Sequence, residues 1–128
     1  MIYVDSSVAL AYLLMEERSP PPEFWEESLI SSRLLEYELW NRIHAYGLSR
    51  SHAEEVRTMV ARLSFVELIP PMLERALEPF PIRVRTLDAL HLASIDFVRR
   101  RRPTVPLASY DVRLIAAARA LDIPILPL

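Results

Sequence analysis

Several residue types are missing or rare in this chain of 128 residues, and each absence excludes a class of function. The chain has no cysteine, which rules out disulfide frameworks, zinc knuckles and thiol nucleophiles. Its one glycine, Gly47, is too few for the glycine-rich loops that bind dinucleotides or nucleoside triphosphates. No apolar run reaches the roughly 18 to 20 residues that span a bilayer, and no signal-peptide pattern opens the chain. We therefore expect a cytoplasmic protein that does not contact a membrane.

Lysine is also absent, so all 15 basic residues are arginine. We attribute this bias to the base composition of the genome rather than to a preference for bidentate phosphate contacts. The formal net charge of -2 does not indicate nucleic-acid binding as a strongly basic chain would. Hydrophobic residues make up 52% of the sequence, which is enough for one domain, residues 1–128, with a full core.

Strand patterns and helix patterns alternate along the chain. Short apolar runs predict strands at 1–4, 28–31, 64–70, 105–109 and 123–128. Helices are predicted at 6–17, from about 22, and at 32–46, 49–63, 71–80, 86–102 and 110–121. Gly47 should end one helix, and Ser49 or Ser51 should cap the next. Because parallel strands need crossover connections, we expect an α/β fold with helices on both faces of a mostly parallel sheet of about five strands.

Two acidic residues come shortly after predicted strands. Asp5 directly follows the first strand, and Asp111 follows the strand at 105–109 within a few residues. Open parallel sheets bind ligands at the carboxyl ends of their strands, near the point where the strand order reverses. The two carboxylates therefore converge if their strands are neighbours, although each is also a good helix N-cap.

Two further acids lie on predicted helices. Asp88 is on a helix with a wide apolar surface, and Thr86 is the better N-cap of that helix. A buried carboxylate needs a hydrogen-bonding partner or a cation, and His91, one turn on, is a candidate partner. We favour a packed or hydrogen-bonding His91 over a metal ligand. Glu38 has a simpler explanation, an exposed ion pair with Arg42 four residues on.

Four stretches of the chain resemble the motifs of one known family. In order, they are "MIYVDSS", "SSRLLEYE", "TLDALHLAS" and "SYDVRLIAAARALDIPIL". They resemble the PIN-domain family, in particular its VapC-type toxin ribonucleases, over nearly the whole chain. The resemblance implies a three-layer α/β/α fold and places the family's catalytic, metal-binding acids at Asp5, Glu38, Asp88 and Asp111. It places the small hydroxyl residues beside them at Ser6 and Ser109.

The resemblance also implies an activity and its partners. An all-oxygen ligand set favours Mg²⁺ or Mn²⁺ over zinc. The implied reaction is hydrolysis of an RNA phosphodiester by a metal-activated water, with structured RNA such as tRNA or rRNA as the substrate. A VapB-type antitoxin that blocks the groove, by inserting a basic side chain among the carboxylates, and a homodimer are implied as well.

Two other functions fit part of this pattern. A phospho-accepting receiver domain has a similar outline, but its family uses a lysine at the site and this chain has none. A catalytically idle PIN-like module that binds only a protein partner remains the alternative. Metal-dependent hydrolysis is the observation that separates this module from a nuclease.

Several charged and aromatic residues near these motifs have structural explanations, which we favour. Asp96, two turns after Asp88, is expected to be solvated or structural rather than a ligand. The run 99–102 consists of arginines that suit the negative end of their own helix. The large aromatic residues are expected in the core or at an interface rather than as base-stacking platforms; they are Trp25, Trp40 and Tyr46.

Overall fold

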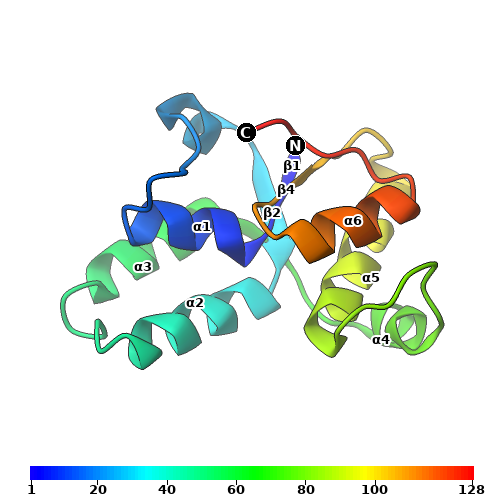
Figure 1. Ribbon diagram of the computed structural model, residues 1–128, viewed down its shortest axis with the longest axis horizontal. Helices are drawn as coiled ribbons and strands as arrows, with labels where there is room; N and C mark the ends of the chain where they lie inside the picture. The colour runs from blue at the N-terminus through cyan, green and yellow to red at the C-terminus, as the bar shows by residue number, and fades with distance from the viewer.

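The computed structural model describes residues 1–128 and places a parallel sheet between two layers of helices (Figure 1). The strands are β1 (Ile2–Val4), β2 (Leu29–Ser32), β3 (Ser64–Val66) and β4 (Leu107–Ala108). They are ordered β3-β2-β1-β4, and every pairing between them is parallel. The predicted three-layer α/β/α arrangement is confirmed.

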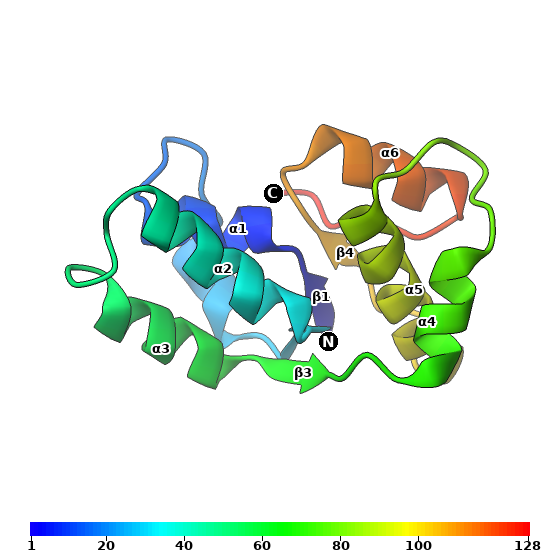
Figure 2. The same cartoon turned by 90° about the horizontal axis from the view of Figure 1, so that it is seen from below.

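Three helices cover one face of the sheet and three belong to the other side (Figure 2). On the first face lie α1 (Ser6–Leu13), α2 (Leu34–Ala45) and α3 (Ala53–Arg62), with the short 3₁₀ helix η1 (Pro22–Glu26) at its edge. On the other side, α5 (Thr86–Arg101) and α6 (Val112–Ala120) pack on the sheet, and α4 (Pro70–Leu77) packs against α5. None of these helices is both long enough and apolar enough to cross a membrane.

The alternation of side chains along β1 divides the core in two. Ile2 and Val4 pack with α1, α2 and α3, whereas Tyr3, between them, packs with α5 and α6. Successive residues of a strand point to opposite faces, so an apolar run of three residues serves both layers. The strand is therefore buried throughout. Asp5 directly follows it, at the edge of the core.

The predicted fifth strand is wrong, because the C-terminal segment makes only one isolated bridge, from Leu107 to Ile125. Pro124 and Pro127 flank that bridge, and proline has no N–H to contribute to a ladder. Two backbone bonds remain there: Leu107 donates to the Pro124 carbonyl, and Leu126 donates to the Leu107 carbonyl.

Two local predictions at helix ends had different outcomes. Gly47, with φ of 69°, follows α2 directly after its C-cap, as expected for a residue that tolerates the left-handed region. Neither predicted serine caps α3, whose N-cap is His52 without a side-chain hydrogen bond. Ser49 bonds to the His44 ring instead, and Ser51 contacts the carbonyl of residue 48.

The switch point of the sheet, where successive strands begin to be added on its other side, lies between the parallel strands β1 and β4. From β1 the chain adds β2 and then β3 on one side, and returns to place β4 on the other side of β1. Ligands of open parallel sheets bind at such a switch point, beyond the carboxyl ends of the strands. Asp5 and Asp111, which follow these two strands, therefore lie at the edge where a site is expected.

Candidate functional site

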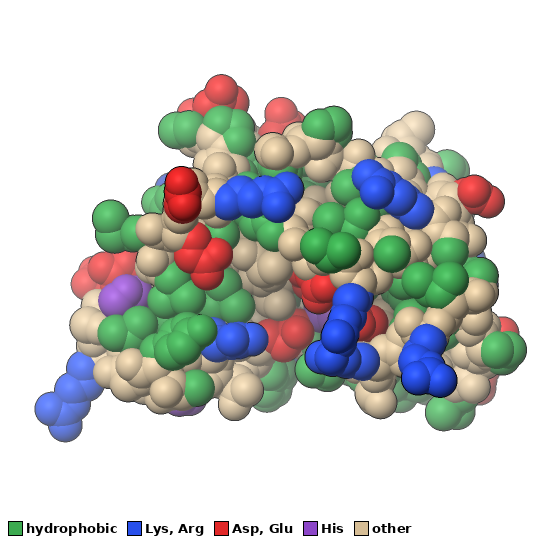
Figure 3. Space-filling view, viewed as in Figure 1, with side chains coloured by type: hydrophobic (Ala, Val, Ile, Leu, Met, Phe, Trp, Pro, Cys, Tyr) green, Lys and Arg blue, Asp and Glu red, His purple; other side chains and the backbone are tan.

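Five acidic side chains line one groove at this switch point. Four are the predicted acids, which are Asp5 after β1, Glu38 on α2, Asp88 on α5 and Asp111 before α6, and the fifth is Glu16, which follows α1. Figure 3 shows acidic side chains gathered near the centre of the molecule, between the α1–α2 side and the α5–α6 side, with basic side chains around them. The structure thus brings together the four acids that the sequence singled out.

Asp5 is held through only one of its carboxylate oxygens. It is the N-cap of α1, and its Oδ2 accepts hydrogen bonds from the Ser7 amide at 3.4 Å, the Ser7 hydroxyl at 2.6 Å and the Ser109 hydroxyl at 2.9 Å. Its Oδ1 accepts no hydrogen bond from the protein. Burial raises the pKa of Asp5, and the charge of Glu38 adds to this, while His91 and the two hydroxyls act in the opposite direction.

Asp111 repeats this arrangement at the start of α6. Its Oδ1 accepts the Arg113 amide at 2.9 Å and the Leu114 amide at 3.3 Å, so it caps the helix with one oxygen. Its Oδ2 accepts nothing from the protein. The N-cap explanation and the binding explanation are therefore compatible, because a cap occupies one carboxylate oxygen and leaves the other available in the groove.

Two serine hydroxyls bind the Asp5 carboxylate. Ser109 was predicted beside the site, whereas Ser7 was not. Ser109 donates to Asp5 and accepts the Asp111 amide at 2.9 Å, which ties the ends of β1 and β4 together. Ser6 lines the groove without a side-chain hydrogen bond, whereas Ser7 bonds Asp5 and accepts the Tyr110 amide at 2.9 Å. The N-cap position of Asp5 could have identified Ser7, because the carboxylate of an N-cap residue bonds to the second or third residue of its helix, and Ser7 is the second residue of α1.

Glu38 pairs with a histidine rather than with the arginine on its own helix. Its Oε1 lies 2.5 Å from His91 Nε2, and the other ring nitrogen, Nδ1, lies 3.0 Å from the Tyr3 hydroxyl. Two expectations are therefore wrong: Glu38 forms no ion pair with Arg42, and His91 is the partner of Glu38 rather than of Asp88. Burial lowers the pKa of His91, but the hydrogen bond to Glu38 and the charges of Glu38, Asp5 and Asp88 together outweigh burial and raise it.

Asp88 makes no ion pair, and its carboxylate has a hydrogen bond only with the Arg85 backbone. Partial burial raises its pKa, and the nearby charges of Asp111 and Asp5 raise it further, while His91 and the Arg85 backbone act in the opposite direction. Asp96 on the same helix differs, since its side chain is 43% exposed, pairs with Arg100 at 3.3 Å and does not line the groove. Of the two acids on α5, Asp88 is thus the one that has no ion-pair partner.

The acidic groove suits a hard divalent cation. Asp5 and Asp111 each offer an oxygen without a protein donor, and Asp88 lines the same groove without an ion-pair partner. No three Asp, Glu or His side chains already form a compact ion-binding cluster. Carboxylates about 4 Å apart repel by roughly 4 kcal/mol per pair at an effective dielectric near 20, so drawing them together requires a positive charge among them. Oxygen ligands of this kind fit Mg²⁺ or Mn²⁺.

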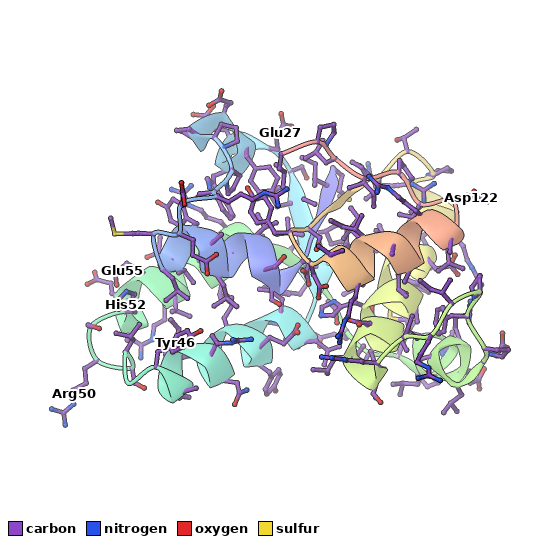
Figure 4. All side chains as sticks on the ribbon, in the orientation of Figure 1. Glu27, Tyr46, Arg50, His52, Glu55 and Asp122 are labelled. Carbon is purple, nitrogen blue, oxygen red and sulfur yellow. The ribbon has the colours of Figure 1, made fainter.

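Arginine–tyrosine pairs lie at the margin of the groove, and motif reasoning did not find them. Arg42 and Tyr46 line it from α2, with Nη1 and the phenol oxygen 3.5 Å apart; Figure 4 labels Tyr46 at the end of that helix. The Arg18 guanidinium stacks 4.7 Å from the centre of the Tyr110 ring, another lining residue. These pairs place positive charge beside the carboxylates without neutralising them.

The arginine run at the end of α5 is engaged elsewhere. Arg99 donates to the Val105 carbonyl, Arg100 pairs with Asp96, and the Arg101 guanidinium lies 5.2 Å from the Phe97 ring centre. None of these arginines lines the groove. The structure thus gives each of the three a partner within or just beyond its own helix.

Comparisons of the whole chain with known proteins point to one family. The sequence pattern described as "PIN domain" matches residues 2–120. Ribonuclease VapC35 of Mycobacterium tuberculosis is 31% identical, over 98% of this chain and 95% of the relative. Ribonuclease VapC47 of the same species is 28% identical, over 93% of this chain and 90% of the relative. A chain from a structure titled "Toxin-antitoxin complex from Klebsiella pneumoniae" superposes with a TM-score of 0.61 at 14% identity, covering 94% of each chain, and shares the fold.

Proposed function

Because the chain belongs to the PIN domain family, with VapC-type relatives along its whole length, we propose that it is a metal-dependent endoribonuclease that hydrolyses RNA phosphodiester bonds. Residues 1–128 act as one nuclease domain in this proposal. The observation that supports it most is the groove at the switch point, which the four predicted carboxylates line from separate parts of the chain.

The cation in this proposal is Mg²⁺ or Mn²⁺, held by Asp5, Glu38, Asp88 and Asp111. When bound, such an ion supplies Lewis acidity toward a phosphodiester oxygen and makes a water molecule more acidic. The carboxylates then also serve as acceptors for protons released in the groove. Ser7 and Ser109 keep Asp5 in one orientation by holding its Oδ2.

The arginines beside the groove give the substrate a place to bind. A phosphodiester chain is negatively charged and is repelled by an acidic groove, so cations at its margin are needed to hold the RNA. Arg42 and Arg18 lie there, each against a tyrosine ring. Arginine suits this role because its planar guanidinium stacks on an aromatic ring and still donates to phosphate oxygens.

The family resemblance supplies the biological setting of the proposal. A VapC-type enzyme is the toxin of a toxin–antitoxin pair, so we expect a cognate VapB-type antitoxin that closes the groove with a basic side chain, and a homodimer of the toxin. The expected substrate is structured cellular RNA, tRNA or rRNA, which places the activity in the cytoplasm.

Sequencing of RNA 5′ ends after brief expression in cells tests the activity and identifies the target together. New 5′ ends at defined positions should appear with the parent chain and be absent with Asp88→Asn. The same ends with both chains, or none with either, would instead support the alternative of a PIN-like module that only binds a protein partner.

A further inference from the structure

A buried chain of hydrogen bonds crosses the molecule from the sheet to the Glu38 carboxylate. The Ser32 amide donates to the Tyr3 hydroxyl at 3.2 Å, that hydroxyl contacts His91 Nδ1 at 3.0 Å, and His91 Nε2 contacts Glu38 Oε1 at 2.5 Å. Tyr3 is fully buried, and His91 is 2% exposed. We propose that His91, oriented by Tyr3, is a positioning residue that fixes Glu38 for cation binding in the groove; this inference rests on the proposed function.

The contact between His91 and Glu38 bridges the two helical layers. Glu38 is on α2 and His91 is on α5, and these helices lie on opposite sides of the sheet (Figures 1 and 2). Glu38 makes no other side-chain hydrogen bond or ion pair. A glutamate side chain has three rotatable bonds, so without His91 nothing in the protein would hold its carboxylate in one place.

The direction of the hydrogen bonds follows from Glu38, because an ionised carboxylate can only accept. His91 Nε2 therefore carries a hydrogen and donates it to Glu38 Oε1. In a neutral ring Nδ1 then has no hydrogen and accepts the Tyr3 hydroxyl, while the Tyr3 oxygen accepts the Ser32 amide. A protonated ring also has a hydrogen on Nε2, so Glu38 receives a donor in either state.

The same division of oxygens recurs at three of the four carboxylates. Asp5 gives Oδ2 to protein donors, Asp111 gives Oδ1, and Glu38 gives Oε1. In each case the second oxygen has no protein donor. Supporting hydrogen bonds of this kind orient ligands around metal ions, and their loss typically costs roughly 10- to 100-fold in metal affinity or activity.

A purely structural role for His91 makes a different prediction. Tyr3 belongs to the apolar cluster of α5 and α6, and His91 is buried next to Tyr3, so replacing either residue can lower stability without any effect on the groove. Affinity for a cation in the folded protein separates the two roles, because a residue that only fills the core leaves that affinity unchanged.

The experiment is a titration of folded protein with Mn²⁺, followed by calorimetry, for the parent, His91→Leu, His91→Gln and Tyr3→Phe. We expect the Mn²⁺ Kd to rise roughly 10- to 100-fold in His91→Leu, by less in Tyr3→Phe, and to recover in part in His91→Gln, whose amide retains a donor. Val98→Ala is the matched control, since Val98 is buried on the same helix in the apolar cluster and does not line the groove. Its Kd should equal the parent's.

A double variant shows whether His91 acts through Glu38. In the Glu38→Gln background, His91→Leu should change the Mn²⁺ Kd by less than about twofold, because the group that it positions has already been altered. Fully additive effects, or an unchanged Kd in folded Tyr3→Phe and His91→Leu, would overturn the inference, as would a parent that binds no Mn²⁺. A parent that binds Mn²⁺ but cuts no RNA would refute the proposed function alone, and the shifts in Kd would still decide this inference.

Discussion

The hydroxyl of Ser109 donates to Oδ2 of Asp5 at 2.9 Å, although the two residues are 104 positions apart in the sequence. One residue follows β4 and the other follows β1, so this bond joins the two strand ends on either side of the switch point. Asp5 is 5% exposed, and a buried carboxylate depends on donors to offset its lost hydration.

Removal of this donor should destabilise the fold. We expect Ser109→Ala to lower the free energy of unfolding by about 1 to 3 kcal/mol, because a hydrogen bond to a buried charged group is lost and the Asp111 amide also loses its acceptor. Urea denaturation measures the change. Ser28→Ala, at an exposed position, is the control and should stay within about 0.5 kcal/mol of the parent. Equal losses in both variants would show that the Ser109 hydroxyl has no special role.

Metal should control both activity and stability of the purified protein. We expect RNA cleavage with Mg²⁺ or Mn²⁺, loss of cleavage in excess chelator, and recovery when metal is added back. The melting temperature should rise with metal concentration, since an ion that binds only the folded state stabilises it by about 2.7 kcal/mol at a concentration 100 times its Kd. Cleavage that persists in chelator would contradict the metal mechanism.

Asp88 and Asp96 provide a matched pair of substitutions on one helix. Asp88→Asn keeps the side-chain shape and removes one negative charge from the groove, so cleavage should fall roughly 100-fold or more. Asp96→Asn removes a charge of the same sign from an exposed pair with Arg100 and should leave the rate nearly unchanged. Initial rates on one RNA substrate measure both. An inactive Asp96→Asn beside a fully active Asp88→Asn would mean that the ligand was assigned to the wrong turn of α5.

Sequence patterns located the acids better than their partners. Asp5 and Asp111 were predictable because a strand followed by an acid and a helix is a local pattern, and the sheet topology then brings two such patterns together. The partner of Glu38 was not predictable in this way. His91 is 53 positions away, and Arg42, four residues away on the same helix, looked like the better partner.

The lengths of the strands and the strand predicted at 123–128 also depend on residues far away in the sequence, and they were predicted less well. Apolar runs mark buried segments, but β4 spans only Leu107–Ala108, and the prolines near Ile125 reduce the last predicted strand to a single bridge. Whether a buried extended segment pairs over its full length depends on the backbone donors and acceptors of the neighbouring strand. The hydrophobic periodicity of the sequence does not show these.

The raised pKa of Asp88 predicts how stability depends on pH in the metal-free protein. Burial and the charges of Asp111 and Asp5 raise this pKa above its ordinary value of 3.8, so the folded state binds a proton at Asp88 more tightly than the unfolded state does. The stability that comes from this preference is fully present below the unfolded pKa and is lost as pH rises through the folded pKa. Ionised Asp88 is therefore a destabilising group at neutral pH without metal.

Asp88→Asn should remove this penalty. In chelator at about pH 7, the variant should melt at a higher temperature than the parent, and the difference should shrink as the pH falls through the raised pKa of Asp88, because Asp88 in the parent then becomes protonated. Thermal melts of both chains across this range measure the difference, which isolates Asp88 from the other titrating groups because they are common to both chains. With saturating Mn²⁺ the order should reverse, because the parent binds the ion more tightly. A variant that melts at a lower temperature than the parent in chelator at neutral pH would show that Asp88 stabilises the metal-free groove. That result would contradict the argument that the carboxylates repel one another there.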